Sequence, residues 1–145
     1  MIQLEWLTPE SDLKTQSSKL DIATFLEHHL GRFGDKKEDI LKAIDYSLNP
    51  EKGGFVVVYK EENDIKAAVV VNKTGMDGYI PAHILVYIAV HESMRGKGIG
   101  KEMMQQVMDK AKGGIALHVE PDNPAKKLYE RLGFTNKYLE MRYQP

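Results

Sequence analysis

The segment RGKGIGK, residues 95–101, is the part of the chain whose residue types and spacing best suit a chemical task. It places three glycines at alternate positions among three cations, Arg95, Lys97 and Lys101. Glycines let backbone N–H groups approach an anion closely, and a helix that begins there adds the positive end of its dipole. The cations supply local charge that suits a pyrophosphate. The same residues are also compatible with an ordinary flexible turn that carries surface lysines.

Two better-known phosphate-binding motifs do not fit this segment. A Walker loop needs Ser or Thr after its Gly-Lys pair, but Glu102 follows that pair here, and Arg95 stands where the first glycine would be. A dinucleotide fingerprint that starts at Gly96 or Gly98 needs a glycine at position 101 or 103, where the chain has lysine and methionine. Neither motif is therefore present.

The composition limits the kinds of protein that this chain can be. Its 145 residues fit one domain, residues 1–145, with a substantial core. Its 20 Lys and Arg nearly balance its 21 Asp and Glu, so we expect neither nucleic acid nor a membrane surface as a partner. The absence of cysteine excludes disulfides, cysteine-rich zinc sites and a thiol nucleophile, and it suits a cytoplasmic protein. No apolar run approaches the roughly 18 residues that a membrane span needs.

Hydrophobic periodicity in the first half of the chain predicts a strand, two helices and a hairpin of two strands. Ser17 or Ser18 is expected to cap the first helix, and Asp35 with Glu38 resembles a capping box for the second. The hairpin is rich in β-branched residues, as strands usually are. The predicted elements cover residues 2–7, 18–31, 35–48, 55–60 and 65–73.

The second half is predicted to contain the centre of the sheet. Residues 82–90 are too uniformly apolar to alternate, which is typical of a strand covered on both faces. The glycine segment then opens an amphipathic helix that ends near Ala111. Beyond it we expect a strand over residues 113–120, a helix capped by Asn123, and a final extended run over residues 134–143.

Two stretches resemble motifs of a known family. IAVHESMRGKGIG resembles motif A of the GNAT superfamily of acyl-CoA N-acyltransferases, whose pattern Q/R-x-x-G-x-G/A is matched by Arg95, Gly98 and Gly100. DNPAKKLYERLGF resembles the second motif, an Asn followed by a helix that contains Leu-Tyr-Glu and ends in Gly-Phe. The order of predicted elements is also similar. The resemblance implies an α/β (α+β) fold whose mixed, mostly antiparallel central sheet is split at the cofactor site and flanked by about four helices.

The resemblance implies acetyl-CoA as cosubstrate and also implies which residues bind it. The pantetheine arm would pair with the split edge of the central strand, with the amide of Val90 directed at the thioester carbonyl. Asn123 is similar to a family side chain that contacts the cofactor arm, and it is equally well explained as a helix cap. The implied cofactor-binding residues are Ile88, Ala89, Val90, Arg95, Gly96, Lys97, Gly98, Ile99, Gly100, Lys101 and Asn123.

Tyr129 resembles the family's general acid, which protonates the departing CoA thiolate, and its spacing would also suit a core tyrosine. The general base departs from the family pattern, because Ile84 occupies the position of a glutamate found in histone-modifying relatives. An amine with a pKa near 10 must lose a proton before it attacks. The candidates for accepting it are His118 and Glu120 on the strand beside the split, and His83 or Tyr87 on the central strand.

The resemblance implies an N-acetyltransferase in which an amine of a small molecule or peptide attacks acetyl-CoA directly. The missing glutamate motivates a second hypothesis, a CoA-binding regulatory or scaffold module without transfer activity. In the first case the acceptor would lie between the first two helices and the sheet. The acidic residues that would attract a cationic amine there are Glu27, Asp35, Glu38 and Asp39.

Only residues 134–145 remain to wall the acceptor site, so we expect the site to be open on one side or closed by a second subunit in a homodimer. No metal site is predicted. His28 and His29 are neighbours on a helix and cannot face one ion together, and no H-E-x-x-H motif occurs.

Overall fold

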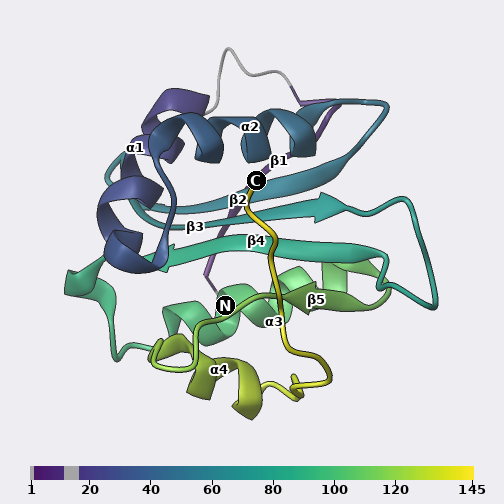
Figure 1. Cartoon of the computed structure of the whole chain (residues 1–145). Helices are drawn as coiled ribbons and strands as arrows, with labels where there is room; N and C mark the ends of the chain where they lie inside the picture. The colour runs from purple at the N-terminus through teal and green to yellow at the C-terminus, as the bar shows by residue number, and fades with distance from the viewer. Residues whose placement is uncertain (1, 12–16) are drawn as a thin grey trace.

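The computed structural model describes residues 2–11 and 17–145, in which a sheet lies between two pairs of helices (Figure 1). Within these residues the sheet has five strands in the order β1-β2-β3-β4-β5, all neighbours being antiparallel except β4 and β5. The predicted mixed, mostly antiparallel sheet with four flanking helices is confirmed. The described strands are β1 (Glu5–Leu7), β2 (Gly54–Glu61), β3 (Asp64–Lys73), β4 (His83–Val90) and β5 (Ile115–Leu117). The described helices are α1 (Lys19–Leu30), α2 (Lys37–Leu48), α3 (Ile99–Ala111) and α4 (Ala125–Arg131), with 3₁₀ turns η1 (Gly31–Phe33) and η2 (Glu92–Met94).

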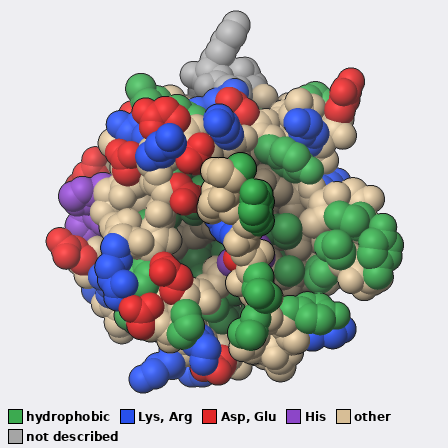
Figure 2. All heavy atoms as spheres, viewed as in Figure 1, with side chains coloured by type: hydrophobic (Ala, Val, Ile, Leu, Met, Phe, Trp, Pro, Cys, Tyr) green, Lys and Arg blue, Asp and Glu red, His purple; other side chains and the backbone are tan. Residues whose placement is uncertain are grey.

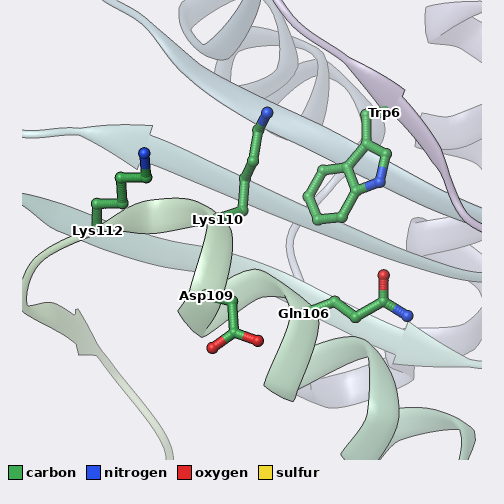
Figure 3. Close-up of a pocket in the computed structure, with 5 residues that line it drawn as sticks. All are labelled: Trp6, Gln106, Asp109, Lys110 and Lys112. Atoms are coloured by element: carbon green, nitrogen blue, oxygen red, sulfur yellow. The ribbon is translucent and has the colours of Figure 1, made fainter. Parts of the chain in front are cut away.

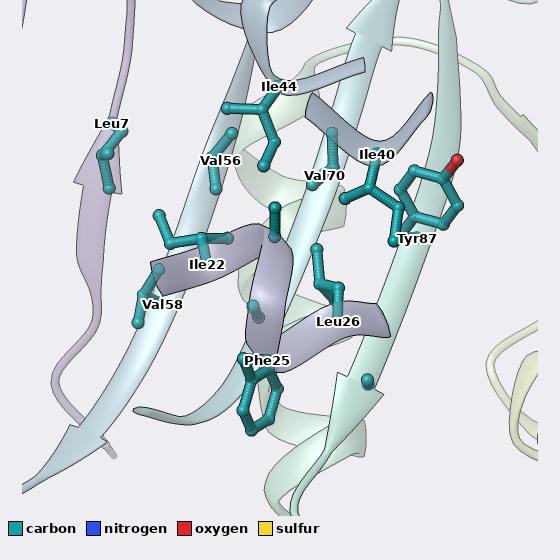
Figure 4. Close-up of a cluster of buried hydrophobic side chains, with 13 residues drawn as sticks. Leu7, Ile22, Phe25, Leu26, Ile40, Ile44, Val56, Val58, Val70 and Tyr87 are labelled. Atoms are coloured by element: carbon teal, nitrogen blue, oxygen red, sulfur yellow. The ribbon is translucent and has the colours of Figure 1, made fainter. Parts of the chain in front are cut away.

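Helices α1 and α2 cover one face of the sheet through a continuous apolar cluster (Figure 4). Ile22 and Leu26 of α1 and Ile40 and Ile44 of α2 are fully buried in this cluster. Each such burial contributes about 1.5–3 kcal/mol relative to exposure. The apolar spacing that predicted these helices therefore marks the faces that hold them on the sheet.

Helices α3 and α4 cover the opposite face. Met103, Met104 and Val107 of α3 are fully buried, and Leu128 of α4 packs against the same cluster. The methionines therefore fill the core, as flexible thioether side chains commonly do. A hydrogen bond of 2.6 Å from the N–H of Ile2 to Oε2 of Glu102 also ties the start of the chain to α3.

The start of α1 was predicted correctly, and that of α2 was not. Ser18 is the N-cap of α1, and its Oγ accepts a hydrogen bond of 3.0 Å from the N–H of Asp21. The expected Asp35–Glu38 capping box is absent, because the N-cap of α2 is Lys36, which makes no side-chain cap. The N–H of Lys37 instead donates to Oε2 of Glu27 at 2.7 Å. A tertiary contact from α1 thus replaces the local cap and leaves Asp35 available for another partner.

A β-bulge in β4 changes which way its side chains point. Val70 of β3 pairs with Tyr87, but the next residue, Val71, pairs with Leu85, so Val86 is the extra residue. Leu85 therefore packs on the α3 face, whereas Tyr87 packs on the α1 and α2 face. Bulges re-aim side chains beside functional sites. Here the bulge lies directly beyond the last residue of β4 that pairs with β5.

β5 is shorter than predicted, and it leaves β4 early. Pairing between the two strands is limited to His83–Leu85 opposite Ile115–Leu117, and β5 ends there rather than at Glu120. His118 and Glu120 therefore lie beyond the strand, exposed to solvent, which corrects their predicted place on it. The last five residues of β4 have no partner from β5, so the expected split in the sheet is present.

The predicted final strand is wrong. Residues 132–145 form no helix or strand, and the tail crosses the front of the sheet as the yellow trace in Figure 1. The outermost strand at this end of the described sheet is β5, and its free edge is only three residues long. Because so short an edge offers few ladder hydrogen bonds, the apolar alternation of the tail is not enough to form a strand within one chain.

Candidate functional site

The glycine segment connects β4 to α3 as an open turn. Gly96 and Gly98 both have φ of 78°, a left-handed conformation that favours glycine, and no atom lies within 4 Å of where a Cβ would be. Gly98 is the N-cap of α3 and provides no side chain to cap it. The first N–H groups of the 13-residue helix α3 are therefore left for solvent or an anion.

The cations of the segment surround this helix start. Lys97 and Lys101 are exposed, and no ion pair among the described residues includes either of them. The Nε of Arg95 donates to the carbonyl oxygen of Val90 at 3.3 Å, which holds its side chain beside the end of β4. The helix start thus combines free backbone donors with two unpaired positive charges.

Gly100 joins the two sequence motifs in space. A Cβ at this position would lie 3.6 Å from Cγ2 of Val90 on β4 and 3.5 Å from Cδ2 of Leu128 on α4. Both distances are ordinary van der Waals contacts, so the start of α3 lies beside both elements. The N-cap of α4 is Pro124 rather than the predicted Asn123, but Oδ1 of Asn123 accepts a hydrogen bond of 2.9 Å from the N–H of Ala125, the first residue of α4.

The unpaired edge of β4 presents the backbone groups of alternate residues. The N–H of His91 donates to the carbonyl oxygen of Lys66 at 2.7 Å, so His91 and, two residues earlier, Ala89 direct their backbone groups toward β3. Because the backbone groups of successive strand residues point to opposite sides, those of Ile88 and Val90 point toward the split. The contact of the Val90 carbonyl with Arg95 is consistent with this direction. The N–H groups of Ile88 and Val90 on this open edge can pair with an extended ligand.

Tyr129 lies on the inner side of α4 and is only 7% exposed. Its ring packs against Phe134, with 5.9 Å between ring centroids, and no hydrogen bond contributes to the pKa of its hydroxyl. Burial raises the pKa of Tyr129 to about 12. The hydroxyl therefore keeps its proton at neutral and moderately alkaline pH and can donate it.

Tyr87 and His83, the two alternatives for the base on β4, are both poorly suited to that role. The hydroxyl of Tyr87 donates to Oδ2 of Asp35 at 2.5 Å. Burial, and then this hydrogen bond, raise the pKa of Tyr87, so it stays protonated. His83 is 5% exposed and lies in the part of β4 that pairs with β5, beside Gly113. Figure 4 shows Tyr87 at the rim of the buried cluster, with its oxygen turned away from the other side chains.

Two arrangements at the site were not predicted. Arg32, just after α1, pairs at 2.8 Å with Asp122, which precedes α4, so it links segments on opposite sides of the split. His29 packs between Phe25 and His91, with ring centroids 4.4 and 4.6 Å away. Burial, and then the neighbouring His91, lower the pKa of His29, which keeps it neutral at pH 7. Phe25 and His29 have the i, i+4 spacing of helix neighbours, but no spacing rule connects Arg32 with Asp122 or His29 with His91.

A separate pocket of about 580 Å³ lies between β1 and the second half of α3 (Figure 3). Trp6 forms one wall, and Lys110 lies with its Nζ 5.7 Å from the Trp6 ring centroid. None of its lining residues belongs to the predicted site. Within the described residues, no group of three or more His, Cys, Asp or Glu side chains could hold a metal ion. No helix within residues 2–11 and 17–145 combines the length and hydropathy that crossing a bilayer requires.

Comparison with known proteins identifies the family. A family model described as an acetyltransferase (GNAT) domain matches residues 51–136, more than half of the chain. The chain belongs to this GNAT acetyltransferase family. It is also 38% identical over 58 residues to the N-alpha-acetyltransferase RimI of Mycobacterium tuberculosis. That match covers 39% of this chain and 37% of the curated relative's length.

Solved structures of acetyltransferases have the same fold. The ribosomal-protein-alanine N-acetyltransferase from Brucella melitensis biovar Abortus 2308 aligns with a TM-score of 0.67 at 15% identity, over 99% of this chain and 98% of that one. The aminoglycoside N-acetyltransferase AAC(6')-Iy, solved in complex with CoA, aligns with a TM-score of 0.69 at 16% identity, over 99% and 95%. At these identities the similarity shows the fold alone.

Proposed function

We propose that this protein is an acetyl-CoA-dependent N-acetyltransferase that acts on an amine of a small molecule or peptide. One observation carries the proposal: the uncapped start of α3 and the unpaired edge of β4 meet at Val90. CoA has a pyrophosphate that fits the start of α3. Its extended pantetheine arm fits the unpaired edge of β4. The structural relative solved with CoA supports this choice of cosubstrate.

In this proposal the residues of the glycine segment divide the binding of CoA between them. The N–H groups of residues 96–101 donate to the pyrophosphate, and Lys97 and Lys101 neutralise its charge. Arg95 holds the end of β4 in place through Val90. Ile88 and Val90 pair with the pantetheine arm, whereas Ala89 contributes through its pairing with β3. Asn123 contacts the arm with its side-chain N–H groups while its Oδ1 accepts from the N–H of Ala125.

The proposed reaction gives each remaining site residue one role. The neutral amine attacks the thioester carbonyl carbon, a C–N bond forms, and the N–H of Val90 stabilises the resulting oxyanion. The C–S bond then breaks as the nitrogen loses its proton, and Tyr129 donates its hydroxyl proton to the departing sulfur. The proton released by the amine, carried through solvent, restores Tyr129. His118 and Glu120, exposed just beyond β5, are the proposed acceptors of that proton through water.

We place the amine beside Asp35 before it reacts. Asp35 lies between η1 and α2 and is hydrogen-bonded to Tyr87 directly after the bulge of β4. Its carboxylate attracts an ammonium group, and Asp39 in the first turn of α2 adds negative charge. The RimI relative is named an N-alpha-acetyltransferase, which favours a peptide α-amine among the acceptors. With no cysteine in the chain, we also propose that the enzyme acts in the cytoplasm.

Replacing Asp35 by Asn should raise the KM for a cationic acceptor about tenfold, because the carboxylate charge is lost. The Asn oxygen still accepts the hydrogen bond from Tyr87, so the fold and the Kd of acetyl-CoA should not change. Steady-state kinetics and calorimetric titration measure the two quantities. Glu51→Gln, which removes an exposed carboxylate in the loop after α2, is the matched control. An unchanged acceptor KM in the Asp35 variant would show that the amine binds elsewhere.

The alternative function is a CoA-binding regulatory or scaffold module, which the isoleucine at position 84 favours. Release of free thiol from acetyl-CoA across a panel of amines separates the two functions. The panel includes peptides with free α-amines, polyamines and aminoglycosides. Turnover with a specific acceptor supports the transferase, whereas tight binding of acetyl-CoA without turnover on any amine would establish the module.

A further inference from the structure

The C-terminal tail exposes an unusual amount of apolar surface. Among the described residues, seven large hydrophobic side chains are exposed, and four of them lie within residues 138–143. These four, Tyr138, Leu139, Met141 and Tyr143, are 76–89% exposed. None of the backbone hydrogen bonds among the described residues involves residues 135–145. The tail therefore has both unpaired backbone groups and uncovered apolar side chains, the two properties of a strand that lacks its partner.

The order of residues in the tail is that of a half-covered strand. Leu139, Met141 and Tyr143 alternate with Glu140 and Arg142. In an extended chain residues i and i+2 share a face, and the ion pair between Glu140 and Arg142 shows that these two do. The three apolar side chains therefore share the opposite face. The alternation predicts a strand, which a single copy does not form.

The tail is also complementary to itself. When two copies run antiparallel with Met141 opposite Met141, Glu140 of each copy lies opposite Arg142 of the other. On the other face, Leu139 lies opposite Tyr143. Opposite charges and apolar pairs at directly facing positions both stabilise an antiparallel ladder. Both favourable pairings occur twice, because a two-fold axis passes through Met141.

We propose that two copies of this chain form a dimer in which residues 138–144 of each copy pair as antiparallel strands around a two-fold axis at Met141. The charge pattern selects a second copy over an unrelated partner, since the segment supplies its own complement. Glu140, and to the smallest extent Asp35, raise the pKa of Arg142 in the tail, which passes in front of the sheet (Figure 1). Figure 2 shows the face that the tail crosses, on which hydrophobic side chains gather at the surface. This inference does not depend on the transfer reaction.

Charge reversal tests the pairing directly. In E140R, arginine would face arginine across the axis, and in R142E, glutamate would face glutamate. We expect sedimentation velocity to show a dimer for the unmodified chain and about tenfold weaker association for each variant. A 1:1 mixture of E140R and R142E restores both opposite-charge pairs and should dimerise as the unmodified chain does. The double variant E140R/R142E should also dimerise.

The fold should be unaffected, since both side chains are on the surface, and thermal melts check this. E51R, which makes the same change of charge in a distant exposed loop, should dimerise normally. A monomer at all concentrations overturns the proposal. So does a dimer that both single variants retain, because its interface would lie elsewhere. Failure of the 1:1 mixture to associate rules out the antiparallel register around Met141.

Discussion

Turnover of the Tyr129→Phe variant is expected to fall by about 10²–10⁴-fold, the usual loss for a general acid or base. The ring and its packing on Phe134 remain, so the Kd of acetyl-CoA should change little. The melting temperature should also change little, because burial alone, and no hydrogen bond, shifts the pKa of the hydroxyl. Steady-state turnover with the best acceptor, measured beside a titration and a melt, separates catalysis from stability.

Tyr46→Phe is the matched control for this variant. The hydroxyl of Tyr46 donates to the carbonyl oxygen of Lys73 at 2.8 Å, far from α4 in the chain. Its loss should cost about 0.5–1.5 kcal/mol of stability and leave turnover unchanged. If Tyr129→Phe retained turnover within a few-fold of the unmodified enzyme, Tyr129 would be a core residue and not the acid.

The pH dependence gives the same prediction a second readout. A tyrosine with the ordinary pKa near 10 would lose its proton as the pH rose through 10. An enzyme that used it as general acid would then lose its activity. Because burial raises the pKa of Tyr129 to about 12, activity should persist above pH 10 as long as the fold does. Between pH 10 and 12 the folded state keeps a proton that the unfolded chain has lost, so stability should decrease across that window.

Replacing both Lys97 and Lys101 by Glu should weaken acetyl-CoA binding by at least about 100-fold. Each charge-assisted hydrogen bond to a phosphate contributes about 1.5–3 kcal/mol, and each reversal adds repulsion. The helix should not be destabilised, since an acidic residue in the first turn of α3 complements its dipole. Calorimetric titration with acetyl-CoA measures the loss.

Lys110→Glu with Lys112→Glu is the control, because it makes the same change of charge at the other end of α3. Equal loss of affinity in both double variants would mean that net charge matters and the position of the lysines does not. A substitution of Gly98 would be a poorer test, since its φ of 78° strains any β-branched residue whether or not CoA binds there.

The sequence predicted the parts of the fold that depend on local patterns. The stripe of Ile40 and Ile44 placed α2, and the glycine segment placed the start of α3, because side-chain spacing and backbone freedom act within a few residues. The N-cap of α2, Lys36, was missed, because the hydrogen bond that replaces a local cap comes from Glu27 on another helix. The bulge at Val86 was missed as well, because register depends on the neighbouring strand.

The candidate site shows the same limit. The family resemblance of the two motifs implied that residues 95–101 and Asn123 belong together, and a Cβ at Gly100 would lie 3.5 Å from Leu128 in the second motif. The hydrogen bond between Tyr87 and Asp35 joins residues far apart in sequence, so no local pattern reveals it. The final strand was predicted from alternation alone, but a strand also needs an edge to pair with, and β5 offers only three residues.

Hydrogen exchange of single amides, followed by NMR with and without acetyl-CoA, tests most directly whether the split sheet binds the cofactor. We expect the N–H groups of Ile88 and Val90, and those at the start of α3, to exchange more slowly in the complex. At about 100 times the Kd the protection can reach about 100-fold. The N–H of Ala89, which faces β3, should change far less. Exchange at Ile88 and Val90 that stays the same in the acetyl-CoA complex would contradict the account.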